Sequence, residues 1–166
     1  MPAPDDSELG ALAIRAGEQL LRRKLRAVTA ESCTGGLVAK LLTDVPGSSQ
    51  WFDCGYVTYS NVAKQRDLSV DPEALREFGA VSELAVTQMA MGALARSGAH
   101  RAVAISGVAG PDGGTADHPV GDVWFALAMR TATTTETRAL NRRFQGDRDA
   151  IRRQSAAMAL QLLVEP

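Results

Sequence analysis

The sequence predicts a three-layer α/β/α sandwich, a member of the α/β class, and three observations carry this prediction. Helix-like and strand-like segments alternate along the chain, a pattern typical of α/β domains. Residues 102–105 form a short, wholly apolar run, as expected of a strand buried on both faces. Polar turns rich in glycine and serine follow successive strand-like segments. We therefore expect a single domain over residues 1–166, with residues 1–6 flexible.

The first half of the chain is predicted to contain two helix–strand pairs and the start of a third helix. Residues 7–24 place apolar side chains on one helical face, and Ser7 is the expected cap. Residues 51–59 are rich in aromatic and β-branched side chains, which favour a strand. The further elements expected here are a strand over 26–29, a helix over 37–43, a turn over 45–49 and a helix beginning at 62–65.

The second half is predicted to contain three strands and three helices. Asp71 and Pro72 precede a short acidic helix, and Ser82 starts a longer apolar one that runs to about Ala95. The buried strand over 102–105 leads into a second glycine-rich loop, over 106–115. The remaining expected elements are strands over 120–129 and 134–144, which pair through a polar connection at 131–135, and an amphipathic helix opened by 146–149.

Composition excludes several classes of protein. The chain has 166 residues and a formal net charge of −1, which gives no electrostatic footprint for nucleic acid or an anionic membrane. It has no apolar run of the about 20 residues needed to cross a bilayer, and its first residues lack a signal-peptide pattern. Cys33 and Cys54 form neither a disulfide framework nor a zinc motif. We expect a cytoplasmic protein without a metal.

The stretch over residues 29–36 (TAESCTGG) is the first candidate for an active-site turn. It brings Ser32, Cys33 and Thr34 to a junction between a strand and a helix. Gly35 and Gly36 allow backbone N–H groups to approach a ligand at a helix N-terminus, where an anion is favoured. The alternative interpretation is an ordinary turn in which Ser and Thr cap the helix.

Three loops are expected to meet at one edge of the sheet. Ser32, Tyr59 with Ser60, and Ser106 with Gly107 each follow a predicted strand. In such sheets ligands bind outside the carboxyl ends of the strands. Neither glycine-rich loop matches a Walker A sequence or a GxGxxG fingerprint, which disfavours a nucleoside triphosphatase or a hydride-transfer enzyme.

A serine nucleophile requires a base, and the candidates are His100, His118 and Lys64. A desolvated lysine loses its charge more easily and accepts a serine proton. Lys64 begins the helix after the second strand, from which it can project toward Ser32. Position alone nevertheless favours a surface role for each of the three side chains.

Several motifs, in this order, give the chain a family resemblance. They are TAESCTGG over 29–36, VPGSS over 45–49, YSN over 59–61 with Lys64, GAVS over 79–82, and GVAGP over 107–111 followed by Gly113 and Gly114. Over about residues 9–163 the chain resembles the CinA C-terminal domain family, in a stand-alone form. The resemblance implies a CinA C-terminal-like amidase that converts nicotinamide mononucleotide and water to nicotinic acid mononucleotide and ammonia.

The resemblance implies a catalytic role for Ser32 as nucleophile and Lys64 as base, through an acyl-enzyme. N–H groups at Thr34 to Gly36, or the Ser106 hydroxyl with the Gly107 amide, would stabilise the oxyanion. Tyr59 would orient Lys64, stack on the pyridine ring or simply anchor its strand, and Glu31 would hold the turn or the ribose hydroxyls. The remaining substrate-binding residues expected, mainly for the phosphate, are Asn61, Gly107, Gly110, Gly113, Gly114, Arg143 and Arg148.

The chain differs from the expected family pattern at four positions. Ser106 stands where threonine is usual, and Val62 replaces a common glutamate. Asp112 stands in place of a glycine, and His118 in place of a frequent lysine. These last two differences lower the positive charge near the second loop and bear on phosphate affinity.

Two alternatives to the serine amidase stay open. Cys33, with Glu31 and Lys64, is similar to the Cys–Glu–Lys set of nitrilase-type amidases, and a thiolate is the stronger nucleophile. The other alternative is a catalytically silent, competence-associated protein that binds a nucleotide. In either case the resemblance implies a homo-oligomer without a cofactor.

Overall fold

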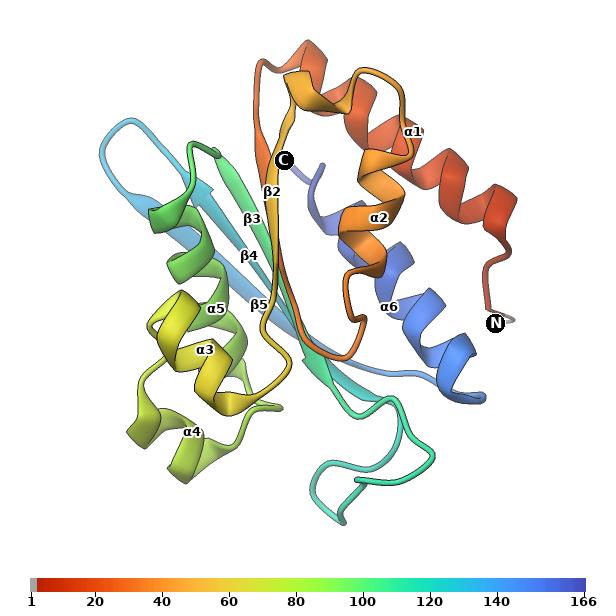
Figure 1. The fold of residues 1–166 in the computed structure, drawn as a ribbon, viewed down its shortest axis with the longest axis vertical. Helices are drawn as coiled ribbons and strands as arrows, with labels where there is room; N and C mark the ends of the chain where they lie inside the picture. The colour runs from red at the N-terminus through yellow and green to blue at the C-terminus, as the bar shows by residue number, and fades with distance from the viewer. Residues whose placement is uncertain (1–2) are drawn as a thin grey trace.

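The computed structural model describes residues 3–166 and shows one five-stranded sheet with helices on both faces (Figure 1). The predicted three-layer α/β/α architecture is confirmed. The elements of the described residues are, in order, α1 (Asp6–Arg22), β1 (Ala27–Glu31), α2 (Leu37–Thr43), the 3₁₀ turn η1 (Ser48–Gln50), β2 (Phe52–Val57), α3 (Asn61–Leu68), α4 (Pro72–Phe78), α5 (Glu83–Arg96), β3 (Arg101–Gly107), β4 (Asp122–Arg130), β5 (Thr135–Arg143) and α6 (Arg148–Leu162).

The sheet has the strand order β2-β1-β3-β4-β5. Strands β2, β1 and β3 run parallel, with Glu31 level with Val57 on one side and Ile105 on the other. Strands β4 and β5 pair with each other as predicted, in an antiparallel hairpin, and β4 also pairs antiparallel with β3. The carboxyl ends of β1, β2 and β3 therefore meet at one edge of the sheet, as the sequence predicted.

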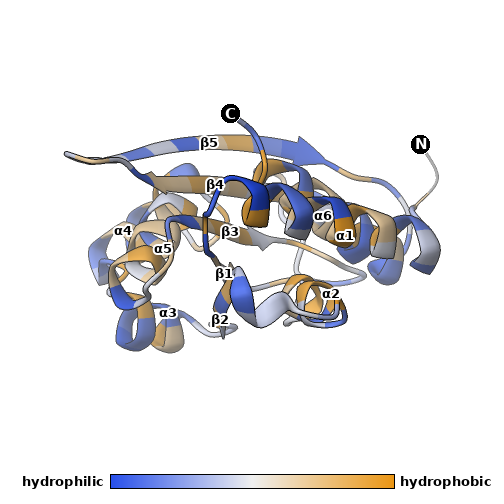
Figure 2. Ribbon diagram, turned by 90° about the horizontal axis from the view of Figure 1, so that it is seen from above, coloured by the Kyte–Doolittle hydropathy of each residue, from blue (hydrophilic) through white to orange (hydrophobic). Residues whose placement is uncertain are grey.

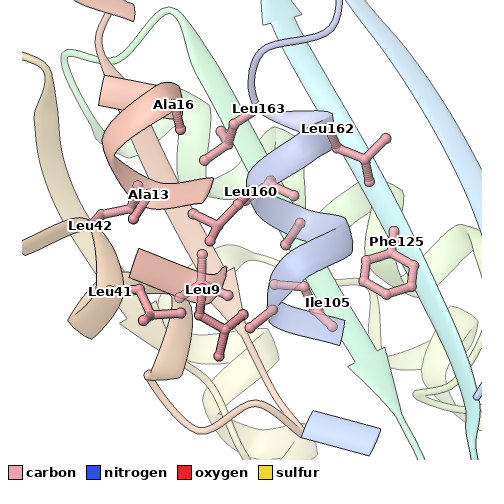
Figure 3. Close-up of a cluster of buried hydrophobic side chains, with 14 of the residues drawn as sticks. Leu9, Ala13, Ala16, Leu41, Leu42, Ile105, Phe125, Leu160, Leu162 and Leu163 are labelled. Carbon is pink, nitrogen blue, oxygen red and sulfur yellow. The ribbon is translucent and has the colours of Figure 1, made fainter. Parts of the chain in front are cut away.

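Two apolar clusters hold the layers together. Helices α1, α2 and α6 cover one face of the sheet, and α3, α4 and α5 cover the other (Figure 1). On the first face, Leu9 of α1, Leu42 of α2 and Leu160 of α6 pack over Ile105 and Phe125 (Figure 3). Strands β3 and β4 lie between the helical layers, whereas the edge strand β5 is largely hydrophilic (Figure 2).

The N-terminal segment differs from the prediction. Asp5, not Ser7, caps α1: its carboxylate accepts the Glu8 N–H, and the Glu8 carboxylate accepts the Asp5 N–H, a reciprocal capping box. The side chain of Arg153 donates to the carbonyl of Pro4 and to the Asp6 carboxylate. The part of the expected flexible segment that the structure describes is thus tied to α6, and residues 1–2 lie outside the described residues.

Within residues 3–166, no helix combines the length and the hydrophobicity needed to cross a bilayer.

Candidate active site

The turn after β1 is held by the buried carboxylate of Glu31. Its two oxygens accept the backbone N–H groups of Gly36, Val38 and Ala39 at 3.0, 3.1 and 2.8 Å. Helix α2 has no side-chain cap at Gly36, so Glu31 satisfies its first N–H groups in place of a capping Ser or Thr. Glu31 is fully buried. Of the two roles left open by the sequence, these bonds correspond to the holding of the turn.

Lys64 lies beside Ser32. Its Nζ donates to the Ser32 Oγ at 3.1 Å and to the Thr58 carbonyl at 2.8 Å. Helix α3 supplies this lysine from its first turn, and the Ser60 side chain caps that turn. Only 1% of Lys64 is exposed. The solvent-exposed role that position alone favoured for Lys64 is therefore wrong.

Burial changes the acid–base behaviour of Lys64. Loss of hydration disfavours the ammonium form and lowers the pKa of Lys64 to about 8. Among residues 3–166 no carboxylate lies within ion-pair distance of its Nζ. With this pKa, about a tenth of the Lys64 side chain is neutral at pH 7 and about half at pH 8, and a neutral amine beside a hydroxyl is able to accept its proton.

Cys33 is buried in the apolar core next to the Ser32 turn. It belongs to the apolar cluster beneath α1, α2 and α6 and is 5% exposed. Burial, aided by the nearby Glu31 carboxylate, raises the pKa of the Cys33 thiol to about 11. A thiol that stays protonated at neutral pH is a poor nucleophile, so the geometry favours Ser32 over Cys33.

The end of β3 forms the next wall of the site. The Ser32 N–H donates to the Ile105 carbonyl at 2.9 Å, which places Ser32 against the end of β3. Ser106, the next residue, is 1% exposed. Gly107 follows, and a Cβ there would come within 2.6 Å of the Asp122 carbonyl. Only glycine allows β3 to approach β4 this closely.

Two arginines on the first turns of α6 hydrogen-bond to the three loops at the carboxyl edge of the parallel strands, which we call the rim. Arg148 donates to the Gly110 carbonyl at 2.6 Å and to the Tyr59 hydroxyl at 3.0 Å. One turn later, Arg152 donates to the Thr34 carbonyl at 2.8 Å. Arg148, predicted to bind phosphate, thus already binds two protein groups. Sequence reasoning missed Arg152, although its spacing of four residues from Arg148 puts both on one helix face.

Other predicted residues lie farther out on the rim. Asn61 is exposed at the first position of α3, and Arg143 is exposed at the end of β5, opposite Asp122. Gly110 is buried, whereas Gly113 and Gly114 are exposed. The loop that carries these glycines extends beyond the end of the sheet (Figure 1).

A second polar cluster lies at the base of this loop. The Nδ1 of His118 is 2.8 Å from one Asp122 oxygen, and the Asn141 amide donates to the other at 2.6 Å. His118 is therefore fixed rather than freely solvated. His100, the other histidine, accepts the Arg26 N–H at 3.0 Å on the opposite edge of the sheet. Within residues 3–166 neither histidine hydrogen-bonds to Ser32, and the titratable side chain that does so is Lys64.

Fold and site together define an α/β protein with a buried serine–lysine pair at the carboxyl edge of its parallel strands. The CinA C-terminal domain model matches residues 10–166. The chain belongs to this family.

Relatives with a named activity match over nearly their whole length. Nicotinamide-nucleotide amidohydrolase PncC of Escherichia coli K12 is 53% identical over 160 residues, 95% of this chain and 94% of the relative. PncC of Pseudomonas putida is 51% identical, over 93% and 94%. Among solved structures, the competence/damage inducible protein CihA of Agrobacterium tumefaciens superposes with a TM-score of 0.88 at 43% identity, over 99% of this chain and 97% of that one.

Proposed function

We propose that this chain is a nicotinamide-nucleotide amidohydrolase that converts nicotinamide mononucleotide and water to nicotinic acid mononucleotide and ammonia in pyridine-nucleotide recycling. The observation that carries the proposal is the 3.1 Å contact between the buried Lys64 Nζ and the Ser32 Oγ. The proposal is also supported by sequence identities of 53% and 51% to the two amidohydrolases, over nearly the full length of the chain.

In the proposed mechanism, the Ser32 Oγ attacks the carboxamide carbon while Lys64 takes its proton. The tetrahedral intermediate collapses as Lys64 returns that proton to the amide nitrogen, which leaves as ammonia. The resulting Ser32 ester is then attacked by water, with neutral Lys64 again accepting a proton. Return of this proton to Ser32 releases the carboxylate product and regenerates the enzyme.

The negative oxygen of the intermediates requires donors that are free to bind it. The N–H of Gly35 already donates to the Ser32 carbonyl, and that of Gly36 donates to Glu31. These two predicted donors are therefore engaged within the turn. We assign the role to the Thr34 N–H and the Ser106 hydroxyl, from the two neighbouring strand ends.

The remaining rim is suited to the rest of the nucleotide. Tyr59 is 60% exposed, so its side chain is accessible to a pyridine ring that would stack on it. Backbone N–H groups of the loop over 110–114 are suited to a phosphate, with Arg143 as a further cation. From the net charge of −1 we also infer that the protein binds neither nucleic acid nor a membrane. From the family resemblance we infer a cytoplasmic homo-oligomer that acts without a cofactor.

The test is ammonia release from nicotinamide mononucleotide by the purified protein and by its Ser32→Ala and Cys33→Ala variants. We expect release by the wild type and by Cys33→Ala, and a loss of at least about 10³-fold in Ser32→Ala. Loss only in Cys33→Ala would move the nucleophile by one residue. Nucleotide binding by the wild type without ammonia release would support the silent binding protein instead.

A further inference from the structure

A pocket rich in arginine lies at the edge of the sheet opposite Ser32. Arg101 begins β3 and is level with Ala27, the first residue of β1, whereas Ser32 follows the last residue of β1. The hollow has a volume of about 320 Å³. Its arginines come from four elements or their ends: Arg23 after α1, Arg101 of β3, Arg130 of β4 and Arg138 of β5.

These four guanidinium groups have no carboxylate partner among residues 3–166. Arg101 donates to the carbonyls of Leu163 and Glu165, and Arg23 donates to the same C-terminal segment. Arg130 donates to the Leu94 carbonyl at 2.7 Å. Neutral carbonyls hold the arginines in place without cancelling their charge.

The local charge is strongly positive although the chain as a whole is not. The protein has 18 Lys and Arg against 19 Asp and Glu, so the surplus is a property of this pocket. Glu136 lines the pocket, and the carboxylate of Glu165 is close enough to Arg101 to act on its pKa. Arg101 is 5% exposed, and its burial, together with the charges of Arg23 and Arg138, lowers its pKa against the smaller opposing effect of the Glu165 carboxylate. An anion in the pocket would relieve both the desolvation and the repulsion.

We propose that this pocket binds a small ligand that carries phosphate groups, separately from the substrate site at Ser32. Four guanidinium groups outnumber the carboxylates of Glu136 and Glu165, and this surplus of positive charge fits an anionic ligand. Guanidinium groups present paired N–H donors that match phosphate oxygens in geometry. Arg23 and Arg138 are exposed and have N–H groups facing solvent that are able to meet the ligand.

The test is a titration of ¹⁵N-labelled protein with inorganic pyrophosphate, followed by amide chemical shifts. We expect saturable shifts clustered at residues 99–101, 129–131 and 136–138. Arg138→Gln removes one exposed guanidinium and is expected to weaken binding about tenfold. Arg142→Gln is the matched control: it removes the same charge from the same strand, but Arg142 is not among the lining residues. This variant should bind within about twofold of the wild type.

Three results would overturn the proposal. They are the absence of saturable shifts, shifts confined to the loops around Ser32, and an equal loss of affinity in Arg138→Gln and Arg142→Gln. The last would indicate a general effect of charge. Because neither substitution touches Ser32 or Lys64, amidase activity measured on the same samples reports separately on the proposed function.

Discussion

The Nζ of Lys64 and the Oγ of Ser32 lie 3.1 Å apart although 32 residues separate them in the chain. Parallel pairing of β1 with β2 makes this contact, because the Thr58 N–H donates to the Glu31 carbonyl at 2.9 Å just beyond the paired strands. The Thr58 carbonyl in turn accepts from Lys64. Lys64 is thus positioned by the backbone that continues the sheet.

The first prediction concerns the pH dependence of catalysis. With a pKa of about 8, Lys64 becomes protonated as the pH falls, and a protonated amine cannot accept the Ser32 proton. We expect kcat/KM for nicotinamide mononucleotide to fall about tenfold per pH unit below this value and to level off above it. A Lys40→Met variant is the control, since Lys40 is exposed on α2 and pairs with Asp44. The kcat/KM of this variant should show the same fall below about pH 8 as the wild type. A wild-type kcat/KM that is constant from pH 6 to 9 would contradict the role of Lys64.

The second prediction uses stability instead of activity. The folded state lowers the pKa of Lys64 from 10.5 to about 8, so between these values the unfolded chain holds a proton that the folded chain lacks. The Lys64 contribution to the free energy of unfolding therefore rises with pH across this window, and its full penalty is present below pH 8.

The Lys64→Met variant has no such penalty. Relative to the wild type, its stability advantage should shrink by roughly 2–3 kcal/mol between pH 7 and pH 10. Urea unfolding of both proteins at several pH values measures this difference, and other titrating groups cancel in the comparison. Parallel pH profiles for the two proteins would argue against a strongly lowered pKa.

The third prediction tests the turn under Ser32. Glu31→Gln leaves one acceptor oxygen where two oxygens receive three backbone N–H groups, and it turns an NH₂ donor toward them. We expect the free energy of unfolding to fall by about 2–4 kcal/mol, because buried donors are left unsatisfied. Glu73→Gln on α4 is the control, since that carboxylate is exposed and pairs only with Arg76; it should cost less than about 1 kcal/mol. Equal losses would mean that the Glu31 bonds add no particular stability.

Local sequence patterns, such as apolar spacing and glycine positions, predicted most helices and strands and also indicated the turn at Ser32. Helix α2 has the predicted bounds because its apolar spacing and the preceding glycines are local signals. The start of α1 was placed two residues late because both Asp5 and Ser7 are able to cap a helix. Only the Glu8 side chain, which bonds back to Asp5, distinguishes them.

Contacts between distant segments were harder to predict. The burial of Lys64 depends on how β1 pairs with β2, and no local pattern around residue 64 encodes it. Family motifs, rather than periodicity, indicated this lysine. The bonds of Arg152 to Thr34 and of Asn141 to Asp122 likewise join segments that meet only in the folded chain.

The last prediction concerns the link between the rim loops. Arg148 joins the Tyr59 hydroxyl to the Gly110 carbonyl, so it holds two loops that we assign to substrate binding. Tyr59→Phe removes one of these bonds, and Arg148→Met removes both. We expect each change to raise KM for nicotinamide mononucleotide severalfold, with a smaller effect on kcat, since Ser32 and Lys64 keep their contact.

A double-mutant cycle separates this link from two independent substrate contacts. If Arg148 and Tyr59 act through each other, the double variant should be little worse than Arg148→Met, with a coupling energy of about 0.5–1.5 kcal/mol. Effects of the two substitutions that add in full would show that each side chain meets the substrate on its own. Arg142→Met, on the exposed strand β5, serves as the charge-matched control and should leave KM unchanged.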